Sequence, residues 1–258
     1  MADGVVQVVH EGGIARVTLD RPPLNLFEPG LIAALREAFE HLARETDLRV
    51  IVLTGAGRAF QAGMDVNVLR ALDVASAKRL ISSLHAAIAA VHEAPVPVVA
   101  RINGAALGAG FELALACDLR VAVRDAPLGL PEVQVGVPSV IEAALLPAAI
   151  GPARAAELLF TGDPVRGDEA ATWGLVNRAV AAPDLDAAVD RVVARIVAAA
   201  PAAIRLQKEL VARWRETDLR TAVQYGINAF ATAYATDDAR EGASAFLEKR
   251  EPRWRARP

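Results

Sequence analysis

The apolar pattern of the chain changes at Pro183. Before this residue, short apolar or β-branched runs alternate with longer segments in which apolar residues recur at helical spacing. After it, every apolar pattern has helical spacing. We expect strands at residues 5–9, 14–19, 49–54, 98–102 and 119–123, and helices at 31–42, 76–92, 109–116, 139–150, 185–199, 202–214, 219–234 and 239–249. This order predicts an α/β core followed by an α-helical appendage.

The composition predicts a hydrophobic core that is stable without disulfide bonds or structural metal ions. The chain has 258 residues, and 53% of them are hydrophobic, which is sufficient for a sizeable buried core. The single cysteine, Cys117, excludes a disulfide framework, and its apolar neighbours indicate a buried structural thiol rather than a nucleophile. The four histidines form no ligand-spaced cluster with carboxylates, so we expect no metal site.

Charge and targeting signals narrow the class of protein. The net charge of −3 does not supply the basic face that a nucleic-acid-binding protein needs. Residues 1–12 contain no basic stretch followed by an apolar run, as a secretory signal would. No segment reaches the ~18 uninterrupted apolar residues of a membrane span. We therefore expect a soluble, cytoplasmic protein that binds neither nucleic acid nor membranes.

The most informative segment is a block rich in small residues from Asn103 to Asp118. Its pattern predicts a strand, a glycine-containing turn and the start of a helix near Ala109. The first amides of a helix lack internal partners, so they form a site for negative charge together with the helix dipole. Glu112 lies about one turn along the same face as Ala109. Glu112 either faces this anion site or merely favours the helix dipole, and the segment alone leaves both interpretations open.

Two further loops carry weaker signals. In the loop 60–65, glycine permits a backbone turn that would direct the amide of Met64 toward a ligand. Glu132 follows Pro131 in a segment expected to be irregular. Taken alone, the first is most simply an ordinary loop and the second an exposed, solvated glutamate.

Five segments of the chain together resemble the enoyl-CoA hydratase (crotonase) family, and the resemblance covers nearly the whole chain. They are residues 62–65, 103–118, 131–132, 161–163 with 173–176, and 241–250. The resemblance implies a crotonase-like spiral of β-β-α units over residues 1–200 that forms an acyl-CoA-binding core. It also implies a C-terminal helical oligomerisation region over residues 201–258, which would build a homotrimer or homohexamer.

The resemblance also assigns catalytic roles. The two oxyanion-hole amides of the family match Met64 and Ala109, which would bind the thioester oxygen as it becomes enolate-like. Such donors each contribute typically ~3–4 kcal/mol to catalysis. The two catalytic glutamates match Glu112 and Glu132, twenty positions apart. One would activate the water that attacks the β-carbon, and the other would exchange a proton at the α-carbon.

Coenzyme A would arrive as part of the thioester substrate, with no tightly bound cofactor. For its binding the resemblance points to Leu26, Ala62 and Met64. Residues matching positions that line the CoA from a neighbouring subunit are Phe230, Phe246 and Lys249. The alternative interpretation of these three is two ordinary core aromatics and a surface lysine.

One segment departs from the family pattern. The hydratases have a glycine-rich turn after the position of Pro138, next to the acyl group, whereas this chain continues with Ser139, Val140, Ile141 and Glu142. Ser139 and Glu142 fit the S-x-x-E capping box, so we expect them to cap a helix, with Glu142 as a third catalytic acid as the alternative. The bulkier Val140 and Ile141 put the usual short-chain substrate in doubt.

Three functions remain in view from the sequence. The presence of both glutamates favours a hydratase-type lyase that adds water across the α,β double bond of an enoyl-CoA. The alternatives are an isomerase that moves this double bond with one glutamate, and a CoA-binding subunit without turnover. The sequence does not identify the acyl chain.

Overall fold

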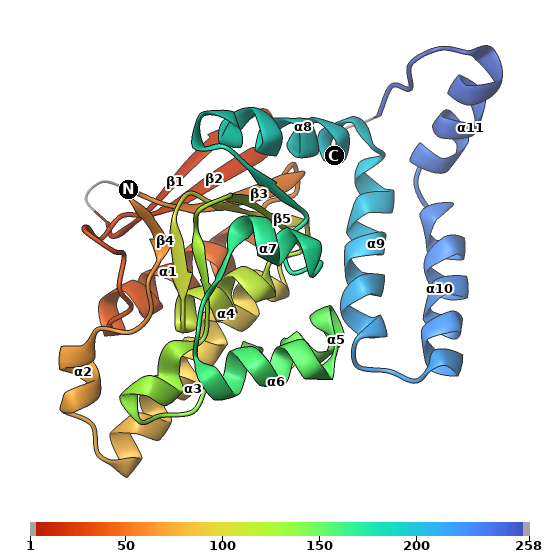
Figure 1. Cartoon of the computed structure of the whole chain (residues 1–258). Coiled ribbons are helices and arrows are strands. Elements are labelled where there is room, and N and C mark those ends of the chain that lie inside the picture. The colour runs from red at the N-terminus through yellow and green to blue at the C-terminus, as the bar shows by residue number, and fades with distance from the viewer. Residues whose placement is uncertain (1–3, 255–258) are drawn as a thin grey trace.

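The computed structural model describes residues 4–254, and its strands form two sheets (Figure 1). The larger sheet has the order β1-β2-β3-β5-β7-β10, and the smaller has the order β4-β6-β8-β9. The strands of the larger sheet are β1 (Val6–Glu11), β2 (Ile14–Leu19), β3 (Val50–Gly55), β5 (Val98–Ile102), β7 (Leu119–Val123) and β10 (Arg178–Val180). Those of the smaller are β4 (Ala59–Gln61), β6 (Ala105–Leu107), β8 (Pro127–Gly129) and β9 (Val165–Arg166).

The larger sheet is parallel apart from the antiparallel hairpin of β1 and β2. Its central strands β3 and β5 are nearly continuous apolar runs, because helices or other elements cover both faces of a parallel sheet. β2, β5 and β7 occupy the residues expected from the sequence. β4 lies where no strand was expected and overlaps the start of the expected loop 60–65, and β6 lies where only a turn was expected.

Helices α1 (Pro29–Leu42), α3 (Val74–His92) and α4 (Ala109–Ala116) pack together, with α3 contacting both others. Every residue of α4 is buried. By length and composition alone, α3 is the one helix in residues 4–254 apolar enough to cross a membrane. A single such helix is weak evidence, and Leu84, Ala87, Ile88 and Val91 of α3 are buried in the core.

Further helical elements connect the strands and surround the core: α2 (Val66–Arg70), η1 (Pro131–Val135), η2 (Glu142–Leu145), α5 (Leu146–Ile150), α6 (Pro152–Thr161), α7 (Gly167–Thr172), η3 (Ala182–Asp184) and α8 (Leu185–Ala198). Here η denotes a 3₁₀ helix. The continuous helix expected over 139–150 was wrong. Residues 139–141 are not helical, and the remainder is divided between η2 and α5.

The C-terminal helices α9 (Pro201–Trp214), α10 (Leu219–Ala233) and α11 (Asp238–Glu248) stand at one side of the core (Figure 1). Their number and positions agree with the sequence expectation. Among the three, α9 is held to the core: the ammonium of Lys208 donates to Asp118 at 2.7 Å, and Arg205 donates to the backbone oxygen of Leu48 at 2.9 Å. The division into a core at 1–200 and an oligomerisation region at 201–258 stays a prediction, and residues 1–3 and 255–258 lie outside the described residues.

Candidate active site

The turn into α4 brings the carboxylate of Glu132 against a glycine. Gly108 has φ +55°, and its amide donates to the backbone oxygen of Gly129 at 2.8 Å. A Cβ atom at this position would stand 2.6 Å from Oε1 of Glu132 and 3.7 Å from Cα of Gly63. Glycine is therefore needed here both for the backbone conformation and for space. Three chain segments meet at this point.

A buried glutamine shapes the loop after β4. The side chain of Gln61 accepts from the amide of Gly63 at 2.7 Å and donates to the oxygen of the same residue at 2.8 Å. This clamp holds Gly63 at φ +97° and fixes the position of the next residue, Met64. The sequence interpretation missed Gln61. Its complete burial next to a glycine is visible only in the fold.

Two backbone amides expected to bind an anion lie on these contacting loops. Met64 pairs with Phe27 through an isolated parallel bridge. The two hydrogen bonds of this bridge are donated by the amides of Phe27 and Asp65, so the amide of Met64 takes no part in it. Ala109 is the first residue of α4, so its amide has no partner within the helix. Neither amide has an acceptor within residues 4–254. Two donors near a helix N-terminus suit a ligand oxygen that gains negative charge.

Glu112 is almost fully buried, with 3% of its surface exposed. Its Oε1 accepts from the amide of Ala143 at 3.0 Å, which ties α4 to η2. Burial, together with the nearby carboxylates of Glu132 and Glu142, raises the pKa of Glu112 from about 4.5 to about 7. Such a carboxyl group can hold or release a proton near neutral pH, which is the property of a general acid or base.

Glu132 occupies a different environment. It lies in the first turn of η1 rather than in the irregular segment expected, and it is half-buried. The hydroxyl of Ser139 donates to its Oε2 at 2.7 Å, while Oε1 faces Gly108. Ser139 therefore positions Glu132. The fold brings Glu112 and Glu132 into electrostatic contact although twenty residues separate them.

The capping box expected at Ser139 and Glu142 is wrong. Ser139 lies outside any helix and gives its hydroxyl to Glu132. Glu142 begins η2, a 3₁₀ turn without a side-chain cap, and its Oε1 is hydrogen-bonded to Nδ1 of His85 on α3 at 2.8 Å. The pattern failed because both side chains find partners elsewhere in the fold.

The residues expected to contact CoA fall into two groups. Leu26, Ala62 and Met64 lie together, since the amide of Ala62 donates to the oxygen of Leu24 at 3.1 Å and Met64 pairs with the residue after Leu26. The aromatic and basic residues of the second group lie on α10 and at the end of α11, away from α4 in Figure 1: Phe230, Phe246 and Lys249. Phe230 and Phe246 are 70% and 84% exposed, so the interpretation as core aromatics was wrong.

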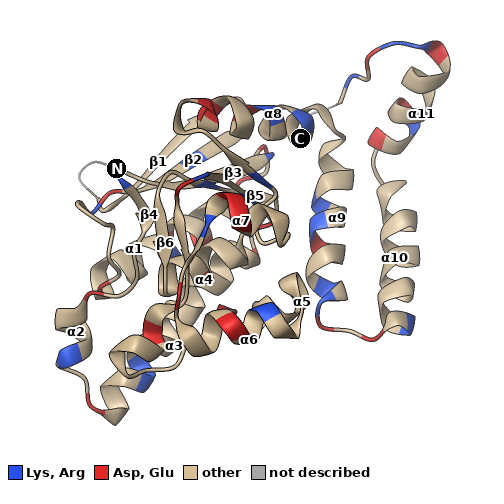
Figure 2. Cartoon of the chain, viewed as in Figure 1, with Lys and Arg blue, Asp and Glu red and all other residues tan. Residues whose placement is uncertain are grey.

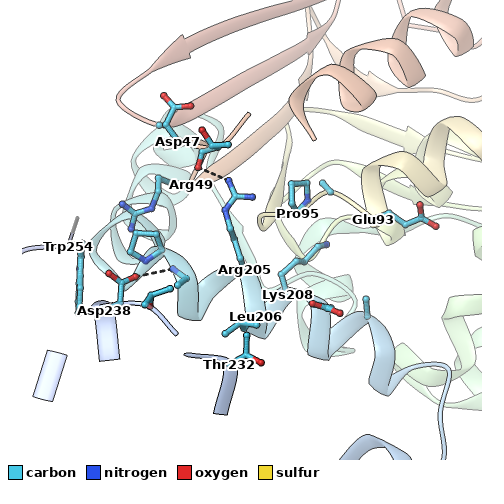
Figure 3. A pocket seen from close by; sticks show the side chains of 18 of the residues that line it. Asp47, Arg49, Glu93, Pro95, Arg205, Leu206, Lys208, Thr232, Asp238 and Trp254 are labelled. Carbon is cyan, nitrogen blue, oxygen red and sulfur yellow. Dashed lines mark hydrogen bonds between the residues drawn. The ribbon is translucent and has the colours of Figure 1, made fainter. Parts of the chain in front are cut away.

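A hollow of about 1600 Å³ lies away from the candidate site. It lies between the C-terminal helices and the core, and it brings together Arg205 and Lys208 of α9, Asp238 of α11 and Trp254 (Figure 3). No residue of the candidate site lines it. Because three helices form much of its wall at the edge of the molecule, it belongs to the C-terminal region rather than to the site.

Metal and thiol chemistry receive no support from the arrangement. Within residues 4–254, no three His, Cys, Asp or Glu side chains group in a way that would hold a metal ion. The prediction that Cys117 is a buried thiol is confirmed, and burial raises the pKa of this thiol to about 12. A thiol with such a pKa is a poor nucleophile at neutral pH.

The chain is similar to known proteins both in sequence and in fold. The family described as enoyl-CoA hydratase/isomerase matches residues 9–257. A crotonyl-CoA hydratase from Syntrophomonas wolfei is 32% identical over 93% of this chain and 94% of its own length. A carnitinyl-CoA dehydratase from Salmonella enteritidis is 33% identical over 98% of both. The solved structure of an enoyl-CoA hydratase from Mycobacterium smegmatis has a TM-score of 0.94 and 36% identity, covering 98% of this chain and 99% of that one. The expected crotonase-like fold is confirmed, and the chain belongs to the enoyl-CoA hydratase/isomerase family.

Proposed function

We propose that this chain is an enoyl-CoA hydratase, which adds water across the α,β double bond of an acyl-CoA thioester. The observation that carries the proposal is the pair of carboxylates in unlike environments beside two amides that have no acceptor within residues 4–254. Glu112 is buried with a pKa of about 7, whereas Glu132 is half-buried and hydrogen-bonded to Ser139. Unlike environments allow two carboxyl groups to act as acid and base in one step.

In the proposed reaction the thioester oxygen accepts hydrogen bonds from the amides of Met64 and Ala109. These donors stabilise the enolate that forms when the oxygen of water bonds to the β-carbon. One glutamate takes the proton that this water loses, and the other gives a proton to the α-carbon, so the product gains H and OH overall. Leu26, Ala62 and Met64 would contact the CoA portion, and no tightly bound cofactor is required.

Relatives support the reaction class without deciding the acyl chain. One is named a crotonyl-CoA hydratase and another a carnitinyl-CoA dehydratase, and both names describe the movement of water to or from an acyl-CoA. The family also includes isomerases by its name. An isomerase needs only one proton-transferring carboxylate, so two placed carboxylates favour hydration.

The direct test is to follow the ultraviolet absorbance of the conjugated thioester in crotonyl-CoA and longer 2-enoyl-CoAs. We expect the absorbance to fall as water adds, with the 3-hydroxyacyl-CoA as product by mass spectrometry. The same absorbance is followed with a 3-enoyl-CoA as substrate. A rise in absorbance, with no hydroxyacyl product from either the 2-enoyl or the 3-enoyl substrate, would instead establish an isomerase. If the protein binds these thioesters but converts none of them, it is a CoA-binding subunit without catalytic activity.

Assembly through the C-terminal helices is part of the proposal. Figure 2 shows that α10 carries very little charge, and Arg220 is its one charged residue. Leu219, Ile227 and Phe230 on this helix are all more than half exposed. An apolar face of this kind needs a partner surface. A second copy of the chain in a trimer or hexamer fits the family resemblance and would place Phe230, Phe246 and Lys249 beside a neighbour's CoA.

We expect the wild-type protein to form a trimer or hexamer and Ile227→Asp to weaken this assembly, because an interface must then bury a charge. Light scattering at several protein concentrations measures both. The matched control is Val74→Asp, which places the same charge at a 91% exposed valine on α3. A wild-type monomer, or an Ile227→Asp assembly as stable as the control, would contradict the proposed interface.

A further inference from the structure

One buried oxygen of the site region has no partner. Oε2 of Glu142 is the one buried side-chain nitrogen or oxygen within residues 4–254 that lacks a hydrogen bond, although the other oxygen of this carboxyl group binds His85. The residue is only 8% exposed. Leaving a buried polar atom without a hydrogen bond destabilises the folded state, so proteins rarely retain one without a use.

Glu142 lies near the two proposed catalytic acids. The residue after it, Ala143, donates its amide to Oε1 of Glu112, and the carboxylate of Glu142 is one of the charges that act on Glu112. Ser139, three residues earlier, holds Glu132. The segment that positions both acids therefore also carries Glu142. It replaces the glycine-rich turn that the family resemblance places beside the acyl group.

We propose that Oε2 of Glu142 forms a subsite for a hydroxyl group on the acyl chain, beyond the reacting carbons. This inference rests on the proposed acyl-CoA function, because it places the acyl chain beside Glu112 and Glu132. The hydrogen bond to His85 occupies Oε1, whereas Oε2 is buried and has no partner within residues 4–254. The subsite selects hydroxylated acyl chains over purely hydrocarbon chains.

A hydroxyl group fits this oxygen better than other polar groups do. Burial raises the pKa of Glu142, whereas the hydrogen bond and the charge of His85 act in the opposite direction. A hydroxyl both donates and accepts, so it pairs with Oε2 whether the carboxyl group is ionised or protonated. An ammonium group only donates, so it suits the ionised form alone. A methyl group satisfies neither form and leaves the oxygen unpaired.

The test compares the binding of saturated acyl-CoAs, which lack the double bond and therefore cannot be hydrated. The two members of a pair have acyl chains of equal length, and one ends in a hydroxyl group where the other ends in a methyl group. The pairs cover acyl chains of four to seven atoms. Calorimetry should give at least one pair in which the hydroxylated member binds ~10-fold tighter, the size of a hydrogen bond to a charged or buried group. Glu142→Leu should abolish this preference and bind the hydrocarbon member at least as tightly.

The matched control is Glu40→Leu, which removes a carboxylate that pairs with Arg36 on the exposed face of α1. This variant should keep the preference, and Glu142→Gln, whose amide both donates and accepts, should keep most of it. Equal binding within every pair by the wild type would overturn the subsite, whether or not the variants fold. A preference that survives in folded Glu142→Leu would do the same. Failure of the proposed hydration is seen separately, as intact selective binding with no turnover of any enoyl-CoA.

Discussion

Replacement of Glu112 by glutamine is expected to lower the hydration rate at least ~100-fold, the effect of losing one general acid or base. Glutamine keeps the shape of the side chain and can still accept from the amide of Ala143, but it cannot transfer the proton. Glu132→Gln should have a comparable effect, because each acid performs half of the reaction. Binding of a saturated acyl-CoA should survive in both variants.

Steady-state kinetics with a 2-enoyl-CoA measures the loss of turnover, and calorimetry with the saturated analogue measures any loss of binding. Glu40→Gln is the control, since this exposed glutamate pairs with Arg36 on the outer face of α1. Full hydration by Glu132→Gln would refute the two-acid mechanism and favour the isomerase. A loss of binding that equals the loss of rate in Glu112→Gln would give this residue a structural role instead.

Because the pKa of Glu112 is raised, Glu112→Gln should also change how the stability of the protein depends on pH. The folded pKa of about 7 exceeds the ordinary value near 4.5, so the folded state binds more protons than the unfolded state between these pH values. Wild-type stability should therefore fall as pH rises from 4.5 to 7 and then level off. The full difference corresponds to about 3 kcal/mol. Glu112→Gln does not ionise, so it should melt several degrees above the wild type at pH 8 and near it at pH 4.5.

Much of the fold was predictable because its central elements have strong local signals. β5, β7 and α4 occupy the expected residues, since each is a buried apolar run bounded by polar or glycine positions. β4 and β6 were missed because three residues are too few to show a periodicity. They pair with each other across 45 or 46 residues of sequence, which no local pattern records.

The candidate site was predictable only where its residues are close together in the sequence and lie in one element of secondary structure. Ala109 and Glu112 share one helical turn, so their relation follows from helix periodicity. Ser139 was misassigned because its S-x-x-E pattern is local, whereas its hydroxyl donates to Glu132, seven residues earlier and in another element. His85 could not be linked to Glu142 from the sequence, because 57 residues separate them and only the packing of α3 brings them together.

The substitution Gly108→Ala should lower hydration by ~100-fold or more, the cost of displacing one oxyanion donor. The new methyl group would stand 2.6 Å from Oε1 of Glu132, closer than real side chains approach, so either this acid or the turn must move. Movement of the turn displaces the amide of Ala109, which directly follows. The proposed general acid–base and the proposed oxyanion donor are therefore disturbed by one methyl group.

Gly57→Ala separates this effect from simple backbone strain. Gly57 also has positive φ, at +71°, but a Cβ atom there would meet nothing within 4 Å. Alanine at positive φ strains the backbone, so both variants should lose stability in thermal unfolding, and Gly108→Ala should lose more because its methyl group also meets Glu132. Only Gly108→Ala should lose turnover, because Gly57 touches no residue of the site. Equal activity losses in the two variants would attribute the effect to strain and remove the contact between Gly108 and Glu132 from the mechanism.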